Sequence, residues 1–224
     1  SLTSEEKSAL LGWIDSGMPQ GRPEDAPAPK VFTDGWRIGT PDMVFEMPEE
    51  AVIEPTGVVP YLYFRTPTNF EEDVWIEAAE WRAGNSKVLH HIVMFYEDPN
   101  FVADPRDAAL GPISGRGFLG GYAPGSRPVV HREGVATRIP AGATLVWQMH
   151  YTPTGKEERD RSQFGIRFAE GPVVHEYEHA APANFSFSIP PGDDNHRVES
   201  ELTFPDDVLL YSICPHMHLR GKSF

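Results

Sequence analysis

The sequence contains very little cysteine, because Cys214 is the single one among 224 residues. One thiol excludes a disulfide within the chain, and it also excludes metal sites of the Cys-x-x-Cys type. Long apolar runs are absent as well: the longest, such as residues 208–214, stay below ten residues, whereas a membrane-spanning helix needs roughly 20. We therefore predict a disulfide-free chain with no membrane span.

Positive charge is also scarce. Lys and Arg total 19 against 33 Asp and Glu, which gives a formal net charge of −14 at pH 7. Nucleic acid is itself a polyanion, so this balance argues against nucleic-acid binding. No signal peptide is recognisable and the chain does not begin with Met, so we expect a mature or excised piece of a longer protein.

Proline and glycine, by contrast, are abundant, with 22 and 20 copies spread along the chain. Between them lie short runs rich in β-branched and aromatic residues, a pattern typical of an all-β sandwich or barrel. The Gly/Pro-rich stretch 97–140 is expected to be a long loop, the kind of region that often carries functional sites. The expected strands are 58–65, 73–81, 88–96, 144–151, 164–168, 183–189, 196–203 and 208–214.

The first 30 residues follow a different pattern. A cap at Thr3 or Ser4 with acidic residues behind it predicts a helix that ends near Gly17. One short helix is not stable alone, so we expect it to belong to an upstream domain. Residues 20–30 form a Pro-rich linker, and a turn cluster at 170–172 suggests a further domain boundary.

Nine histidines are present, and the group with the clearest spacing is His216-Met217-His218. In a strand, residues i and i+2 point to the same side, so the two imidazoles can converge on one ion. Neutral imidazole suits copper, zinc, iron and nickel. The alternative is a pair of solvent-facing histidines.

Two further groups lie in expected strands. His90 and His91 are adjacent, and adjacent residues of a regular strand face opposite sides, so both reach one ion only if the strand twists or ends there. Otherwise one ring faces the core, where it needs a polar partner, and the other faces solvent. His150 lies near the end of its strand, where it is either a metal ligand or a structural histidine.

A competing pattern is formed by His175, Glu176 and His179, which match the HExxH signature of zinc proteases. In that signature a helix places both histidines on one face and the glutamate acts as the base. The segment is short and bounded by prolines, and it opens on two valines, which favours a strand. In a strand, Tyr177 would share a face with the two histidines and Glu176 would turn away. The histidines in polar, turn-rich surroundings, expected at the surface, are His131 and His196.

The order of the three stronger groups resembles the copper type II, ascorbate-dependent monooxygenases, the family of peptidylglycine α-hydroxylating monooxygenase and dopamine β-monooxygenase. That order is an adjacent His pair, then a strand ending in His-Tyr, then His-x-His. The segments IPAGATLVWQMHYTPTG and PHMHLRGKSF are similar to a bacterial branch of the family. The resemblance implies two copper ions, one held by His90, His91 and His150, the other by His216, His218 and a Met beyond Phe224.

The same resemblance implies a fold and an activity. The fold is two antiparallel β-sandwich domains of jelly-roll type, residues 31–171 and an incomplete second domain at 172–224. Residues 1–30 resemble the tail helix of a cytochrome c-like domain with its linker. The activity is hydroxylation of a substrate C–H bond by O₂, with His216 and His218 at the catalytic copper and an external reductant such as ascorbate or a cytochrome c-like domain.

Two further expectations follow by analogy, and two alternatives stay open. The relatives act outside the cytoplasm, so a periplasmic or secreted location is expected. Peptide-hydroxylating members carry an Arg two positions before the His-x-His pair, and Cys214 stands there, which argues against a C-terminal peptide substrate. The alternatives are a non-catalytic copper-binding module and a zinc hydrolase that uses His175, Glu176 and His179.

Overall fold

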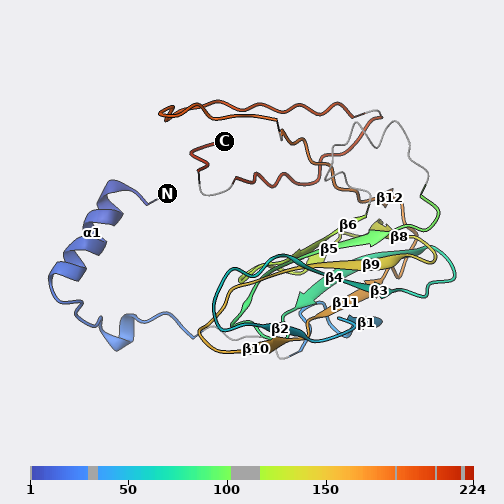
Figure 1. Cartoon of the computed structure of the whole chain (residues 1–224), viewed down its shortest axis with the longest axis horizontal. Helices are drawn as coiled ribbons and strands as arrows, with labels where there is room; N and C mark the ends of the chain where they lie inside the picture. The colour runs from blue at the N-terminus through green and yellow to red at the C-terminus, as the bar shows by residue number, and fades with distance from the viewer. Residues whose placement is uncertain (1, 30–34, 102–116, 185, 205, 218–219) are drawn as a thin grey trace. The chain divides into compact units, whose positions relative to one another are not determined.

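The computed structural model describes residues 2–29, 35–101, 117–184, 186–204, 206–217 and 220–224 (Figure 1). The chain divides into two compact units, Ser1–Asp34 and Gly35–Phe224. The first contains helix α1 (Ser4–Asp15) and a short 3₁₀ helix, η1 (Pro23–Asp25).

The predicted helix is confirmed as α1. The Thr3 hydroxyl accepts from the backbone N–H of Glu6, and the Glu6 carboxylate accepts from the backbone N–H of Thr3, which is a capping box. Gly17 follows the helix with a φ of 85°, a left-handed conformation that glycine adopts without strain. No helix in the described ranges combines the length and the apolar composition that crossing a membrane requires.

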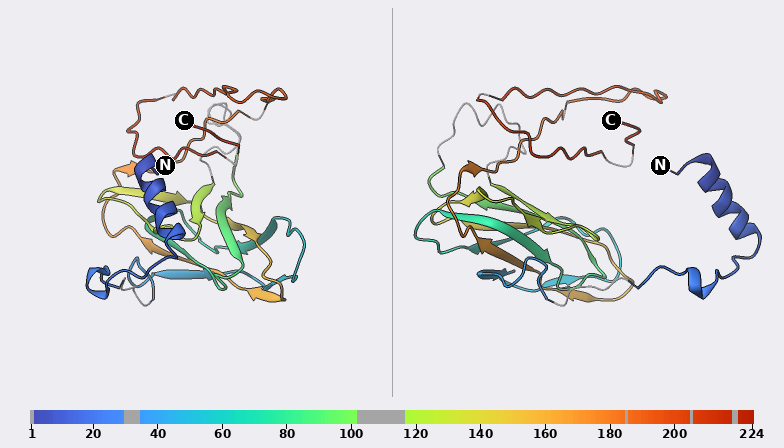
Figure 2. Two further views of the ribbon diagram at one scale, coloured as in Figure 1. Left: turned by 90° about the vertical axis from the view of Figure 1, so that its left-hand side faces the viewer. Right: turned by 180° about the vertical axis from the view of Figure 1, so that it is seen from behind.

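The second unit is an all-β sandwich, as the composition predicts (Figures 1 and 2). The larger sheet has the order β1-β11-β4-β8-β12, with β7 paired to β4, and the smaller has the order β3-β9-β5-β6. The pairs are antiparallel except for β12 with β8. The strands of the larger sheet are β1 (Met43–Glu46), β4 (Val74–Arg82), β7 (Val129–Val130), β8 (Val135–Ile139), β11 (Gln163–Phe168) and β12 (His175–Glu176); those of the smaller are β3 (Leu62–Pro67), β5 (Leu89–Glu97), β6 (Phe118–Tyr122) and β9 (Thr144–Tyr151); β2 (Ala51–Ile53) and β10 (Glu158–Asp160) form a separate pair.

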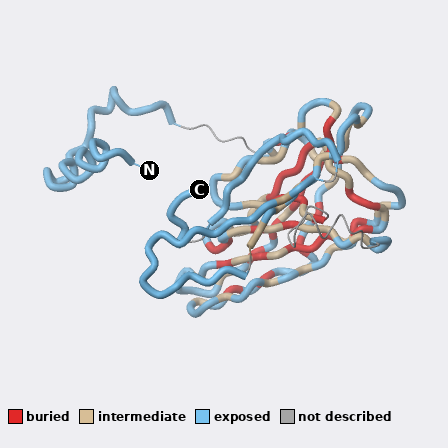
Figure 3. The backbone as a smooth tube through the Cα atoms, turned by 90° about the horizontal axis from the view of Figure 1, so that it is seen from above, coloured by how far each residue is buried: buried red, intermediate tan, exposed pale blue. Residues whose placement is uncertain are grey.

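The core lies between the inner faces of the two sheets, where Figure 3 shows the buried residues. Alternate side chains of a strand point to opposite faces, so each strand sends every second residue inward. From β9 these are Leu145, Trp147 and Met149, all fully buried. Trp81 of β4 stacks on Phe164 of β11 with ring centroids 5.0 Å apart. The outward residues of β9, which include His150, are thereby left on the outer face of the smaller sheet.

The prediction of a long loop over residues 97–140 is wrong in part, because β6, β7 and β8 lie within it. Its glycines meet a packing requirement. A Cβ on Gly120 would collide with the Trp81 ring, and one on Gly121 with the carbonyl of Ile92. Both positions therefore need glycine inside the sandwich rather than in a turn.

The strands predicted at 183–189, 196–203 and 208–214 are also corrected. The described residues after Glu176 form neither helix nor strand, and most are exposed, including Leu209 and Ile213. A strand needs a partner for its backbone N–H and C=O groups, and hydrophobic sequence alone does not supply one. The second sandwich domain at 172–224 therefore remains a prediction.

Candidate metal centre

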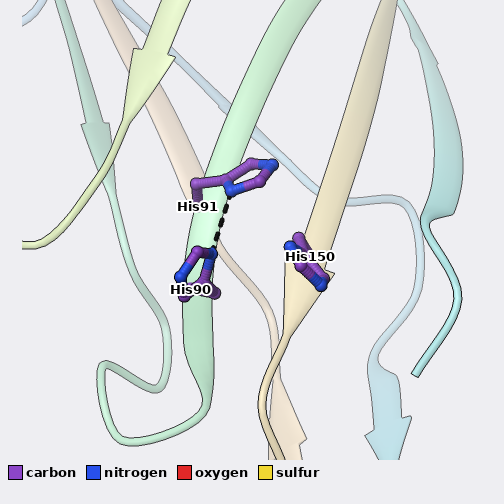
Figure 4. A group of neighbouring side chains, drawn as sticks. All are labelled: His90, His91 and His150. Atoms are coloured by element: carbon purple, nitrogen blue, oxygen red, sulfur yellow. Dashed lines mark hydrogen bonds between the residues drawn. The ribbon is translucent and has the colours of Figure 1, made fainter. Parts of the chain in front are cut away.

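The adjacent histidines lie at an irregularity in the pairing of β5 with β9. Leu89 pairs with Tyr151 and His91 with His150, so two steps along β5 match one step along β9 and His90 is the extra residue. An extra residue of this kind bends the strand and redirects a side chain. Both rings consequently meet on one side, with Nδ1 of His90 3.0 Å from Nδ1 of His91 (Figure 4). This is the departure from regular strand geometry that shared metal binding requires.

His150 completes a group of three imidazoles. Its ring centroid lies 4.9 Å from that of His90 and 4.9 Å from that of His91. One ring nitrogen from each of the three lies within 4.8 Å of the others. Among the residues that the structure describes, this is the group of three or more potential ligands that meets the distances for one ion. The predicted meeting of His90, His91 and His150 in space is confirmed.

The distances can be compared with those of metal coordination. Imidazole nitrogens bind zinc at about 2.0–2.1 Å, so two on one ion lie about 2.9–3.3 Å apart at angles between square-planar and tetrahedral. The separation of 3.0 Å between His90 and His91 fits directly. The remaining nitrogen separations are at most 4.8 Å, so a ring movement of under about 2 Å brings them into that range.

The surroundings of His91 and His150 favour the neutral form of these two rings. Burial lowers the pKa of His91, and the nearby His150 and His90 lower it further. The pKa of His150 is lowered by burial and then by His90. A neutral imidazole offers a lone pair, which is what a metal needs. Nδ1 of His150 is also buried without a hydrogen-bond partner, which is costly unless another group satisfies it.

Tyr61, just before β3, lies beside the three histidines. Its ring centroid is 4.7 Å from that of His150 and 5.8 Å from that of His91, and the residue is 47% exposed. The sequence pattern did not single it out, because the contact depends on how β3 pairs with β9. Gln148, two residues before His150, donates to the Tyr63 hydroxyl at 2.8 Å.

The second predicted copper site lies partly outside the described residues. His216 lies exposed in the irregular segment near the end of the chain, and His218 lies outside the described residues. No geometry therefore bears on that pair, and the site stays a prediction.

The HExxH segment does not have the helix that a zinc protease site requires. His175 and Glu176 form β12, which pairs in parallel with β8, and the backbone N–H of Tyr177 donates to the carbonyl of Ala136. Glu176 lies 3.5 Å from Arg138. The strand interpretation is confirmed for His175 and Glu176 alone, since Tyr177 and His179 lie outside any strand, and the helical i, i+4 placement of the two histidines is absent.

His179 instead belongs to a cluster of rings. Its ring centroid lies 4.6 Å from that of Phe118 and 5.0 Å from that of Tyr177, both in edge-to-face contact, and the Tyr177 centroid lies 4.7 Å from that of His131. Burial lowers the pKa of His179 to about 4, with a further contribution from His131, and burial lowers the pKa of His131. The surface placement predicted for His131 is wrong, because its ring is half-buried and bonds with the Thr137 hydroxyl at 2.9 Å. His196 is exposed, as predicted.

Comparisons with known proteins return no match of the chain to a family model, to a curated protein or to a solved structure.

Proposed function

We propose that this chain is part of a copper-dependent monooxygenase that hydroxylates a substrate C–H bond. The observation that carries the proposal is the meeting of His90, His91 and His150 at a strand irregularity. Three imidazole ligands suit copper, and the His-His, His-Tyr, His-x-His order of the motifs favours a copper oxygenase over other metalloproteins. Copper bound there would supply one-electron redox chemistry.

The overall reaction sets what else is needed. A C–H substrate, O₂, two electrons and two protons give the alcohol and water, so an external donor such as ascorbate or a cytochrome c-like domain must deliver both electrons. His216 and His218 are proposed to hold the second, catalytic copper together with a methionine from outside this chain. A periplasmic or secreted location belongs to the same proposal.

The chain's own residues have clear tasks at the three-histidine site. The irregularity at His90 brings two ligands from one strand together, and β9 brings the third. The Tyr61 ring packs beside His150. A fixed ring orientation is one of the means by which a protein tunes a bound metal.

Copper titration followed by electron paramagnetic resonance tests the proposal. We expect the chain to give a type II Cu(II) signal, ascorbate to erase it by reduction, and air to restore it with O₂ uptake at an electrode. His216→Ala should leave the signal of the three-histidine site in place. A chain that gives no such signal contradicts the proposal. A Cu(II) signal that ascorbate does not erase identifies the non-catalytic copper-binding module instead.

Glu176→Gln separates the oxygenase from the zinc hydrolase. Because Glu176 lies in β12 beside Arg138, we expect its amide variant to keep the Cu(II) spectrum and affinity of the wild type. A hydrolase would need this carboxylate as its base. Hydrolysis of a peptide or ester panel that depends on Zn²⁺ and disappears in Glu176→Gln would overturn the oxygenase proposal.

A further inference from the structure

A buried carboxylate that bonds to both segments carrying the candidate ligands has no part in the chemistry described so far. Asp160 ends β10 and is 2% exposed. It accepts three hydrogen bonds, from the Tyr151 hydroxyl at 2.8 Å, the Ser162 hydroxyl at 2.8 Å and the backbone N–H of Asn85 at 2.6 Å. All three donors are uncharged. A buried carboxylate is costly unless it is well hydrogen-bonded, so these bonds fix their donors strongly.

Two of those donors lie on the two segments that carry the histidines. Tyr151 follows His150 directly at the end of β9. Asn85 begins the turn that leads into β5, where its carbonyl accepts from the backbone N–H groups of Val88 and Leu89. Leu89 is in turn followed by His90. One carboxylate therefore holds the end of one ligand strand and the start of the other.

Further hydrogen bonds connect the end of β9, the turn before β5 and strand β10. The Asn85 side chain donates to Glu158 at 2.9 Å and to the Arg159 carbonyl at 3.1 Å. The backbone N–H of Thr152, just past β9, donates to the carbonyl of Val88. These contacts lie at the end of β9 and the start of β5, beside the register change between Leu89 and His91 that brings the two adjacent histidines together.

We propose that Asp160 is a positioning residue, which sets the register of β5 against β9 and thereby the fit of the three histidines to their metal. This inference rests on the proposed metal binding by His90, His91 and His150. Partners that orient metal ligands typically change metal affinity by about 10–100-fold when they are removed. Asp160 acts through backbone and strand rather than by touching a ligand ring, so the lower end of that range is expected.

The test compares Asp160→Asn with a matched control in the full chain. Glu80 is the control, because it is a buried carboxylate, 3% exposed, on β4 in the other sheet. It accepts from the backbone N–H groups of Arg37 and Ile38 and from the Arg37 guanidinium at 3.1 Å. Asp160→Asn is expected to weaken Cu(II) binding about tenfold and to change the g and hyperfine values of the Cu(II) spectrum. Glu80→Gln should lower the melting temperature and leave that spectrum as in the wild type.

If Asp160→Asn does not fold, Tyr151→Phe provides a second test, because it removes the hydrogen bond to Asp160 and retains the aromatic ring. It should change the spectrum in the same direction by a smaller amount. A wild-type chain that binds no copper refutes the metal proposal itself. A wild type that binds copper, together with variants of lower melting temperature but unchanged affinity and spectrum, shows a purely structural role for Asp160 and overturns this inference.

Discussion

Replacing His150 with alanine is expected to lower the Cu(II) affinity of the three-histidine site by more than 100-fold. His150 is the ligand that β9 contributes, whereas the other two come from adjacent positions of β5. Its removal leaves two imidazoles and an open side facing Tyr61. Loss of a direct ligand should exceed the roughly 10–100-fold effect of losing a supporting partner. The measurement is a competition titration against a chromophoric copper chelator.

Gln148→Ala is the matched control for His150→Ala. Gln148 lies on the same strand and the same face, and its amide bonds with Tyr63 rather than with a histidine. We expect this variant to bind copper as the wild type does. Equal affinities for His150→Ala and the wild type would show that the three rings do not share an ion, and the oxygenase proposal would lose its support.

The candidate ligands could be selected from the sequence, but the reason that they meet could not. The order of the motifs picked out His90, His91 and His150. The sequence also showed that two adjacent histidines need an irregular strand to face one ion. It did not locate the irregularity, because register depends on the pairing of β5 with β9 and on the turn that Asn85 and Asp160 hold in place.

The fold likewise has a part that the sequence predicts and a part that depends on contacts between strands. The apolar runs that became β4, β5 and β9 were predictable because alternation and β-branched residues mark them locally. The strands β6 and β8 were missed because their glycines and polar residues resemble those of a loop. Gly120 and Gly121 are explained only by the Trp81 ring and the Ile92 carbonyl that approach them. Residues 208–214 have a strand-like sequence but no strand partner in the described structure. A local preference for extended backbone does not form a strand without such a partner.

Acidification from pH 7 to about pH 4.5 is expected to destabilise the fold through His179. Its pKa is about 4 in the folded chain, because of burial and the neighbouring His131, against about 6.5 when unfolded. Above pH 6.5 the ring is neutral in both states and its packing contribution is fully present. Between pH 6.5 and 4 the unfolded chain binds a proton that the folded chain does not, so stability falls as pH falls.

The loss is on the order of 2 kcal/mol once partial exposure of the ring is discounted. The rings of Phe118 and Tyr177 packed against His179 carry no negative charge that would stabilise the imidazolium. Denaturant unfolding of the metal-free chain across this pH range measures the effect. His179→Phe retains the ring contacts but cannot titrate, so its stability should depend less on pH, whereas the exposed-site control His196→Phe should follow the wild type. Parallel pH profiles for the wild type and His179→Phe would mean that His179 is already accessible to protons in the native state.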